Sequence, residues 1–276
     1  MNTSPTADCI AFIGGGNMAS AIIGGLLRQG LSASQLEVVE PFAAARDKLR
    51  QQFGVLAREN AAPALERSSL VVWAVKPQTF RQAAAEVRPY TGQALHLSIA
   101  AGIRSDSIAR WLGTQRIVRS MPNTPALIGK GITALYARTG VSAQDQARAE
   151  QVISTTGEWL WVTDEAQLDA VTALSGSGPA YVFFFLEAMT RAGVQMGLSQ
   201  EDAYRLSLGT FAGAAELARA SDDPPEVLRQ RVTSKGGTTE AALRALESDQ
   251  VQALFIKAVE AARQRARELG DEFGVN

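Results

Sequence analysis

Short apolar runs alternate along the N-terminal half of the chain with segments whose apolar residues recur at helical spacing. The runs predict strands, and the run at 70–75 is apolar at nearly every position, which is typical of a parallel strand buried on both faces. In chain order we predict strands at 9–13, 36–40, 70–75, 94–100, 116–121 and 132–136, and helices at 17–29, 43–53, 79–88 and 105–112. This βαβ alternation predicts an α/β fold with a doubly wound, mostly parallel sheet.

Strand patterns stop at Asp164, and the rest of the chain carries helical patterns only. We predict helices at 165–174, 180–196, 201–218 and 249–269, with a break at 175–179, Ser177 as the cap of the next helix and Gly270 as the end of the last. The helix at 180–196 is apolar nearly all round, so we expect it to be buried on every side, within a bundle or between subunits. The sequence therefore predicts an α/β domain at 1–163 and an all-α dimerisation domain at 164–276, with a self-sufficient helical bundle as the alternative.

Three glycines follow the first predicted strand, and a helical pattern begins directly after them. The segment Gly14, Gly15, Gly16, Asn17, Met18 and Ala19 has the pattern Gly-x-Gly-x-x-Ala. Glycines let the backbone turn sharply and approach a phosphate, and the helix start offers N–H groups to a pyrophosphate. This strand–turn–helix context favours dinucleotide binding by a Rossmann-type domain over an ordinary glycine-rich turn.

Several candidate residues follow other predicted strands, and ligands of such sheets bind at the carboxyl ends of the strands. Glu40 stands where an acid accepts hydrogen bonds from ribose hydroxyls, unless it is a solvent-facing acid. Lys76 closes an apolar strand at the binding edge, unless it is only a surface charge. Ala100 and Ala101 are small enough to admit a nicotinamide ring or to serve helix packing, and Asn60 is a cofactor contact or a turn or cap residue.

A second glycine-containing segment lies between two predicted helices of the C-terminal half. Gly236 and Gly237 are followed by Thr238 and Thr239 directly before a helical pattern. Such a helix N-terminus suits an anionic group such as a substrate carboxylate, although an ordinary helix-start loop has the same spacing. His96 is the only histidine and falls within a strand, so we expect a structural role for it, no Ser-His-Asp chemistry and no metal site.

Composition narrows the class of protein further. The 276 residues carry a net charge of −1, and the 27 basic residues are scattered, so we expect no nucleic-acid partner. The single cysteine excludes an internal disulfide and fits a reducing compartment. No signal peptide is visible, and the most apolar helix, at 180–189, is shorter than the roughly 20 residues of a membrane span. We expect a soluble, cytoplasmic protein with no membrane partner.

Taken together, the motifs resemble the Δ1-pyrroline-5-carboxylate reductase family, whose members catalyse the last step of proline biosynthesis. The resemblance spans residues 10 to about 269 and rests on five further segments besides the glycine turn. These are Ala74-Val75-Lys76-Pro77-Gln78, Ala100-Ala101-Gly102, Met121-Pro122-Asn123-Thr124-Pro125, Leu174-Ser175-Gly176-Ser177-Gly178-Pro179-Ala180-Tyr181 and Ser234-x-Gly236-Gly237-Thr238-Thr239. The Met-Pro-Asn-Thr-Pro and Ser-Gly-Ser-Gly-Pro-Ala-Tyr segments are the most specific.

The resemblance implies a Rossmann domain, a helical dimerisation domain and, in some members, a ring of dimers. It implies that NAD(P)H contacts Gly14 to Ala19, Asn60, Ala74, Val75, Lys76, Pro77, Ala100 and Ala101. It also implies that Ser234, Gly236, Gly237, Thr238 and Thr239 hold the substrate carboxylate and serve the partner subunit's cofactor. Thr239 stands at the position of a family threonine that contacts substrate, so it is the candidate for a hydrogen bond to the ring nitrogen, with water as the other possible proton source.

Two residues depart from the family pattern. Lys235 replaces the usual proline of the substrate loop, which adds flexibility and a positive charge there. Glu40 stands where members that favour NADPH have serine, asparagine or arginine. A carboxylate repels the 2′-phosphate and suits the ribose diol of NADH, unless Arg46 swings in to compensate. We therefore predict activity with NADH at least as good as with NADPH.

Two other classes of function compete with this interpretation. A β-hydroxyacid dehydrogenase or a ketopantoate-type reductase has the same architecture, but Lys257 or Lys235 would then have to transfer the proton, and neither lies in the motif of those families. A non-catalytic dinucleotide-binding protein would have no reason to keep the glycines and hydroxyls of the segment 234–239. The sequence therefore favours reduction of a cyclic imine that carries a carboxylate.

Overall fold

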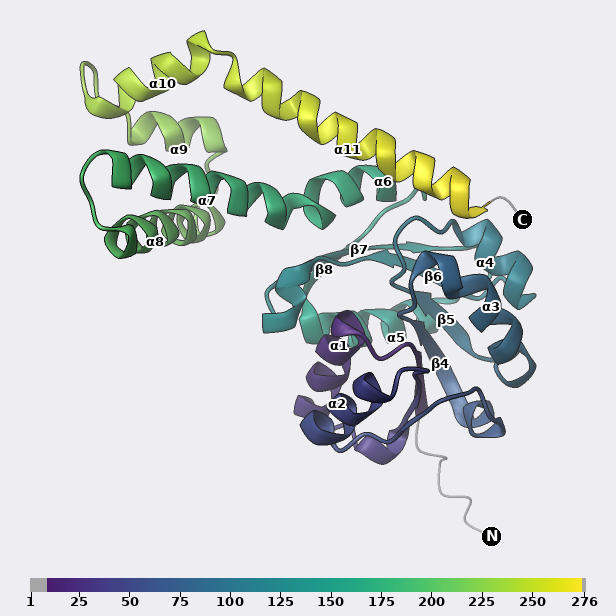
Figure 1. Ribbon diagram of the computed structural model, residues 1–276. Helices are drawn as coiled ribbons and strands as arrows, with labels where there is room; N and C mark the ends of the chain where they lie inside the picture. Colours follow the sequence, from purple (N-terminus) through teal and green to yellow (C-terminus); the bar gives the residue numbers. More distant parts are fainter. Residues whose placement is uncertain (1–8, 275–276) are drawn as a thin grey trace. The chain divides into compact units, whose positions relative to one another are not determined.

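An eight-stranded sheet lies at the centre of the N-terminal part of the chain (Figure 1). The computed structural model describes residues 9–274, and within them the sheet order is β3-β2-β1-β4-β5-β6-β7-β8. The strands are β1 (Cys9–Ile13), β2 (Leu36–Val39), β3 (Ala57–Arg58), β4 (Ser68–Trp73), β5 (Leu95–Ser98), β6 (Ile117–Met121), β7 (Gly131–Ala137) and β8 (Gly157–Trp161). Strands β1 to β6 are parallel, whereas β7 is antiparallel to β6 and parallel to β8. The first six positions of this order are the Rossmann arrangement.

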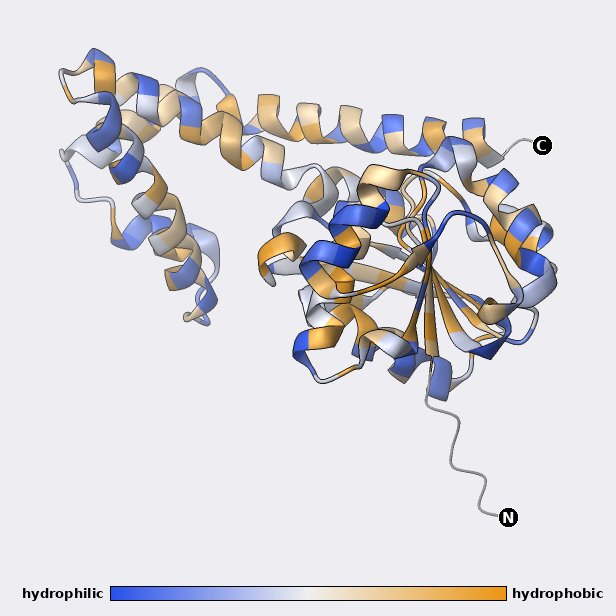
Figure 2. Cartoon of the chain, turned by 60° about the horizontal axis from the view of Figure 1, so that its bottom comes forward, coloured by the Kyte–Doolittle hydropathy of each residue, from blue (hydrophilic) through white to orange (hydrophobic). Residues whose placement is uncertain are grey.

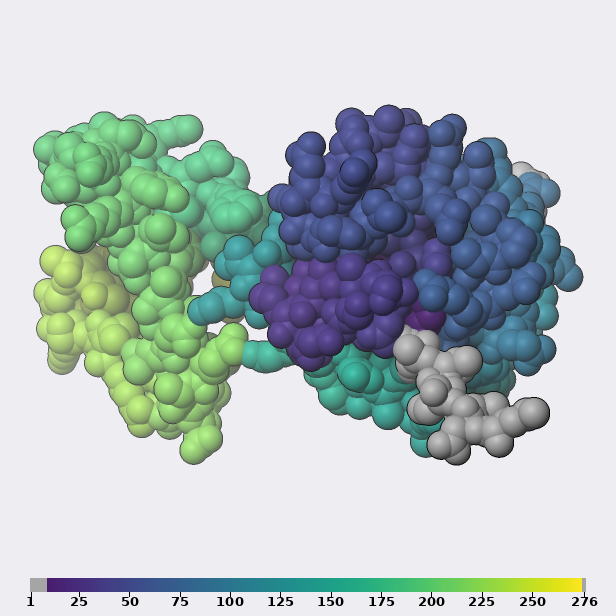
Figure 3. All heavy atoms as spheres, turned by 90° about the horizontal axis from the view of Figure 1, so that it is seen from below, coloured from purple at the N-terminus to yellow at the C-terminus, as the bar shows by residue number. Residues whose placement is uncertain are grey.

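Helices cover both faces of the sheet. One apolar cluster joins Phe12 of β1 to α1 (Asn17–Arg28), α2 (Ala43–Phe53) and α5 (Ala143–Ile153). The other joins Ala11 and Ile13 to α3 (Pro77–Val87) and α4 (Ser105–Leu112). Apolar residues accordingly predominate along the strands in Figure 2, and α1 and α2 lie side by side in Figure 3. The predicted α/β fold class is confirmed.

Two strands and one α-helix of the N-terminal part were not predicted, and neither was the short helix Pro225–Arg231 of the C-terminal part. The two-residue strand β3 and the outer strand β8 are the edges of the sheet, and β8 leaves Trp159 and Leu160 37% and 44% exposed. Such edge strands lack the continuous apolar pattern of a buried strand. Helix α5 has a local signal, because Ser142 and Asp145 form a reciprocal capping box at its start.

The C-terminal part is helical, as predicted, but the predicted break between helices at 175–179 is wrong. Its helices are α6 (Gln167–Val171), α7 (Gly178–Gln195), α8 (Gln200–Arg219), α9 (Pro225–Arg231), α10 (Thr238–Ser248) and α11 (Val251–Gly274). A π-helical turn, Thr172–Gly176, joins α6 to α7. Ser177 has right-handed helical angles of φ −84° and ψ −19°, so it continues the helix and does not cap it. The glycines at 176 and 178 are therefore accommodated within a helical path.

The last helix also runs beyond its predicted end at Leu269. Gly270 lies buried within α11, and a Cβ there would come within 3.1 Å of Arg104 Nε. After it, Asp271 Oδ1 accepts a hydrogen bond of 2.6 Å from Arg104 Nη2, and Phe273 joins the apolar cluster beside α4. Gly270 thus allows close packing against Arg104 and does not end the helix. Contacts with α4 stabilise the last turn, so the helix continues to Gly274.

The chain forms two compact units. One takes in the chain up to Ser177 and from Ala262 onward, and the other is Gly178–Ala261. The second unit has few buried residues of its own. Phe183 and Phe184 of α7 are 58% and 66% exposed, so this helix is not buried within a bundle of its own chain, and the self-sufficient bundle is wrong. Of the two expected ways to bury α7, burial between subunits is the one that stays a prediction. None of the helices among residues 9–274 is long and apolar enough to cross a membrane.

His96 has the structural role predicted for it. Its side chain is 1% exposed, and its Nδ1 accepts a hydrogen bond of 3.0 Å from Trp73 Nε1. Burial lowers the pKa of His96 from 6.5 to about 4, against a smaller opposing effect of the Thr91 backbone. The imidazole is therefore neutral in the folded protein near pH 7.

This neutral histidine makes stability depend on pH. Between pH 6.5 and about 4 the unfolded chain binds a proton at His96 that the folded chain does not. The contribution of neutral His96 to the free energy of unfolding is therefore fully present above this window and is lost as the pH falls through it. We expect the free energy of unfolding to drop by about 2 kcal/mol between pH 7 and pH 5 in urea titrations. In His96→Gln, whose amide can still accept from Trp73, this part of the slope should vanish; an unchanged slope would contradict the assignment.

Candidate active site

The glycine turn lies at the point where the strand order of the sheet reverses. It follows β1, whose neighbours β2 and β4 lead away in opposite directions. Gly14 has φ +97°, its N–H donates to Val39 O at 2.8 Å, and a Cβ would lie 2.6 Å from Ala74 O. Only glycine fits there. Because ligands of doubly wound sheets bind at this switch point, the turn marks the candidate cofactor site.

Helix α1 begins directly after the turn and presents its N-terminus there. Gly16 is the N-cap residue, without a side-chain cap, and a Cβ at this position would meet nothing within 4 Å. The first helical bond runs from Ser20 N to Gly16 O at 2.9 Å, so the N–H groups of Asn17, Met18 and Ala19 have no partner within the helix. Open space above such donors suits a pyrophosphate.

Glu40 follows β2 and is held against the glycine turn. Its carboxylate accepts hydrogen bonds from Gly15 N at 2.7 Å and from Phe42 N at 2.9 Å, and the residue is only 5% exposed. The solvent-facing alternative is therefore wrong. Two backbone donors use only part of the acceptor capacity of a carboxylate, so Glu40 can still accept from a ribose diol.

Arg46 is held by the backbone next to Glu40. Its Nη1 donates to Glu40 O at 2.9 Å and to Pro41 O at 2.7 Å, while its Nη2 contacts Glu59 Oε2 at 3.2 Å. To reach a 2′-phosphate, the guanidinium would have to give up these contacts. The preference for NADH predicted from Glu40 stays a prediction, and these contacts keep Arg46 from compensating unless they break.

The other predicted cofactor residues follow neighbouring strands at the same edge of the sheet. Ala74 touches the glycine turn through its carbonyl, Lys76 is the exposed N-cap residue of α3, and Pro77 opens that helix. Ala100 and Ala101 follow β5, and Ala100 is 5% exposed. Predicted residues that share this edge are Gly14, Gly15, Gly16, Asn17, Met18, Ala19, Glu40, Ala74, Val75, Lys76, Pro77, Ala100 and Ala101.

Asn60 follows the edge strand β3 and is exposed. The N-cap residue of the next helical turn is Ala62, so the cap alternative for Asn60 is wrong. Its cofactor contact stays a prediction.

Asn123 is a residue to which sequence reasoning gave no role. Its Oδ1 accepts from Ile132 N at 3.0 Å and its Nδ2 donates to Ser175 O at 3.2 Å. A Cβ on Gly176 would lie 2.5 Å from Met121 Cε, so the two most specific motifs of the sequence pack against each other. Asn123 thereby fixes the π-helical turn beside the carboxyl end of β6. The sequence signals were its place in the Met-Pro-Asn-Thr-Pro motif and its position two residues after a predicted strand.

Removing the Asn123 amide should destabilise this junction. In Asn123→Ala the N–H of Ile132 and the carbonyl of Ser175 lose their partner in a half-buried place, so we expect a loss of about 1–2 kcal/mol in the free energy of unfolding. Asn123→Asp keeps the acceptor for Ile132 and should lose less. Urea denaturation of the three proteins measures this order, and equal midpoints would contradict it.

The segment 234–239 lies in the second unit. Gly236 has φ +74°, Gly237 N donates to Ser234 O at 3.0 Å, and the Gly236 N–H donates to the carboxylate of Glu240. These bonds form a turn that ends at the start of α10, where Thr238 is exposed and Thr239 half-buried.

The first N–H groups of α10 have no intrahelical partner, and the two threonine hydroxyls add donors beside them. The segment can therefore bind a carboxylate by charge-assisted hydrogen bonds. Lys235 lies within the turn, exposed. Among residues 9–274 there is no group of three or more histidine, cysteine and acidic side chains able to hold a metal.

Two family models match the chain. The model described as pyrroline-5-carboxylate reductase dimerisation covers residues 165–269, and the model described as NADP oxidoreductase, coenzyme F420-dependent, covers residues 9–102. The first includes the exposed apolar helices of the second unit, and the second includes the glycine turn.

Whole-length relatives agree with these matches. The chain is 47% identical over 267 residues to the pyrroline-5-carboxylate reductase of Pseudomonas aeruginosa. The matched region covers 96% of this chain and 98% of the relative. It is also similar to the solved structure of a pyrroline-5-carboxylate reductase from Coxiella burnetii, with a TM-score of 0.88, 39% identity and coverage of 95% and 98% of the two chains. The Plasmodium falciparum pyrroline carboxylate reductase, solved with NADP bound, matches with a TM-score of 0.85 and 28% identity over 97% of this chain and 100% of that one.

Proposed function

The chain belongs to the pyrroline-5-carboxylate reductase family and is an oxidoreductase, and we propose that it reduces Δ1-pyrroline-5-carboxylate to L-proline with NAD(P)H. The observation that carries the proposal is the open glycine turn at the switch point of the sheet, in a chain that matches reductases over nearly its whole length. The turn has an open space at Gly16 and unpaired helix donors, so these residues fit a dinucleotide. The NADP bound to the Plasmodium relative supports the same class of cofactor.

The chemistry needs little acid–base machinery. A protonated C=N bond is a strong hydride acceptor, and the bound nicotinamide supplies the hydride. The start of α1 holds the pyrophosphate and Glu40 accepts from the ribose hydroxyls. The start of α10 orients the substrate carboxylate, and the Thr239 hydroxyl bonds to the ring nitrogen. The protein thus contributes orientation and charge matching, and the absence of a catalytic histidine follows naturally.

A single assay tests the proposal. The protein is mixed with NADH and Δ1-pyrroline-5-carboxylate, and the loss of reduced-cofactor absorbance is followed. We expect turnover with the imine and none with 2-keto or 3-keto acids. Absence of turnover with the imine, or turnover only with a keto acid, would favour the competing dehydrogenases or a non-catalytic protein.

We also propose that each active site draws on two copies of the chain. The second unit carries the family's dimerisation segment and exposes large apolar side chains on α7, α8 and α11, such as Phe184, Leu206 and Leu254. A second copy packed on these helices would remove this apolar surface from water. In that dimer the loop 234–239 of one copy serves the glycine turn of the other. We further propose that such dimers associate into a ring and that the protein acts in the cytoplasm.

Mixed dimers test the shared site. Gly16→Asp places a carboxylate in the open phosphate space, and aspartate is also a good N-cap, so the variant should fold but not bind cofactor. Thr239→Val impairs the other half of the site. Each variant alone should be nearly inactive, but in a mixed dimer one site combines two intact halves. We expect about a quarter of wild-type activity after the variants are unfolded and refolded together at equal amounts. If each site is built from one chain, mixing restores nothing.

A further inference from the structure

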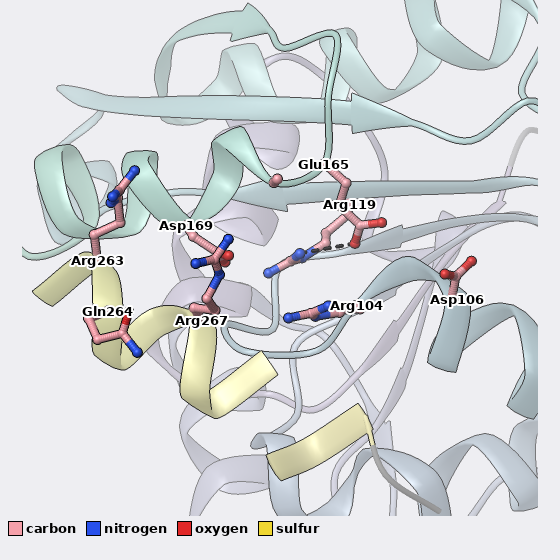
Figure 4. A pocket seen from close by; sticks show the side chains of 9 residues that line it. Arg104, Asp106, Arg119, Glu165, Asp169, Arg263, Gln264 and Arg267 are labelled. Atoms are coloured by element: carbon pink, nitrogen blue, oxygen red, sulfur yellow. Dashed lines mark hydrogen bonds and ion pairs between the residues drawn. The ribbon is translucent and has the colours of Figure 1, made fainter. Parts of the chain in front are cut away.

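A polar pocket of about 280 Å³ lies within the first unit, and its lining includes no residue of the glycine turn or of the loop 234–239 (Figure 4). We call it the arginine pocket and define it by Arg104, Arg119, Arg263, Arg267, Glu165 and Asp169. These residues come from the loop before α4, from β6, from α6 and the loop before it, and from the last turns of α11. Figure 4 shows the side chains of Arg104, Arg119 and Arg267 directed toward the same space. Neither the proposed reaction nor the family's cofactor residues use this pocket.

Arg119 is the buried member of the pocket. Its side chain is only 5% exposed, and its single hydrogen bond to the described residues runs from Nη1 to Glu165 Oε1 at 3.0 Å. An arginine has five N–H donors, so most of the donors of Arg119 have no protein partner. No fully occluded side-chain nitrogen of the described residues lacks a partner, so these free donors reach the pocket space.

The three acids of the lining, Asp106, Glu165 and Asp169, do not satisfy these donors, and Asp106 is paired with Arg138. Glu165 also accepts from Ser105 N at 2.6 Å and from Ser105 Oγ at 2.5 Å, so its oxygens are already shared. Arg104 uses Nη2 on Asp271, outside the pocket lining. Arg267 makes no hydrogen bond or ion pair with any residue between 9 and 274 in the structure. The pocket therefore holds more guanidinium donors than its carboxylates accept.

We propose that the arginine pocket binds a phosphate group, either free or carried by a small metabolite. Guanidinium groups that converge from separate elements match the several oxygens of a tetrahedral dianion, and bonds of this type are charge-assisted. A phosphate held by Arg119 of β6 and Arg267 of α11 joins two segments that lie far apart in the sequence. Its binding would therefore also stabilise the packing of the last turns of α11 on the sheet.

Charge-changing variants test the site by isothermal titration with inorganic phosphate at constant ionic strength. Saturating NADH keeps phosphate away from the glycine turn. Arg104→Gln and Arg267→Gln change exposed side chains, so folding is preserved, and each should weaken phosphate binding at least tenfold. Arg265→Gln is the matched control, because Arg265 lies on the same helix but pairs with Glu268 and Glu272, and its phosphate affinity should equal that of the wild type.

A variant with the opposite effect sharpens the test. Asp169 lines the pocket, and no hydrogen bond or ion pair of its side chain to residues 9–274 is present, so Asp169→Asn removes a repelling charge and should tighten phosphate binding severalfold. The proposal is overturned if the wild type shows no saturable binding, or if Arg104→Gln, Arg267→Gln and Arg265→Gln bind phosphate equally. Imine turnover is measured separately, so failure of the proposed reaction leaves this result unaffected, and the converse also holds.

Discussion

We expect Thr239→Val to lower kcat for imine reduction about a hundredfold and to leave the affinity for NADH unchanged. The Thr239 side chain lies in the first turn of α10, beside the N–H groups proposed to hold the substrate carboxylate. Its hydroxyl can bond to the ring nitrogen as that nitrogen gains electron density, an interaction that strengthens in the transition state. Valine has nearly the same shape but no hydroxyl. Stopped-flow and steady-state assays with NADH and Δ1-pyrroline-5-carboxylate measure the loss.

Two neighbouring variants separate proton transfer from substrate binding. Thr239→Ser keeps a hydroxyl and should retain most of kcat. Thr238→Val removes a hydroxyl assigned to the carboxylate, so it should raise KM for the imine with little change in kcat. If Thr239→Val keeps the wild-type kcat, then water, and not Thr239, delivers the proton.

Glu40→Ser raises the ratio of kcat/KM with NADPH to kcat/KM with NADH about a hundredfold. The buried carboxylate is fixed by Gly15 N and Phe42 N, and we expect it to meet the ribose end of the cofactor in the wild type. Repulsion between such a charge and a 2′-phosphate amounts to roughly 1–4 kcal/mol at hydrogen-bonding range. Serine removes that charge and offers a donor to the phosphate. We expect the wild type to use NADH at least as well as NADPH.

Asp47→Asn is the matched control for Glu40→Ser. Asp47 is an exposed acid of α2, and no hydrogen bond or ion pair of its side chain to residues 9–274 is present, so its replacement leaves the contacts of Arg46 intact. Its replacement should leave the cofactor ratio within about twofold of the wild type. A hundredfold preference of the wild-type protein for NADPH would contradict the role assigned to Glu40.

Much of the fold could be predicted because the sheet is buried on both faces. A strand such as β4 is therefore continuously apolar from Leu70 to Trp73, and helices such as α2 and α4 end at Gly54 and Gly113 in the left-handed conformation. The elements that were missed or misjudged depend on distant contacts instead. Gly270 looks like a helix end in sequence, but its role comes from Arg104, far away in the chain.

The residues of the candidate site also fall into those that a local sequence pattern predicts and those that depend on other contacts. The glycine turn and Glu40 have local signatures, since strand ends and helix starts fix where they lie. No local pattern shows that Arg46 is held by two carbonyl groups, or that Asn123 connects β7 to the π-helical turn. The contacts of Arg46 depend on the path of the chain between Glu40 and α2, and Asn123 joins two segments that only the folded chain brings together. The exposure of α7 could not be predicted either, because its apolar pattern does not show whether the same chain or a second copy covers it.

The division of the chain into units has a consequence for its synthesis. The unit that contains the glycine turn includes residues from Ala262 onward, which pack on Gly102 and α4 through Leu269 and Phe273. These residues are translated after the whole of the second unit, Gly178–Ala261. A nascent chain can assemble the sheet early, but the surface around Gly102 stays uncovered until the end of α11 has left the ribosome. The cofactor-binding unit is therefore completed only after the second unit has been made, and chains that stop before Ala262 carry an unfinished Rossmann unit.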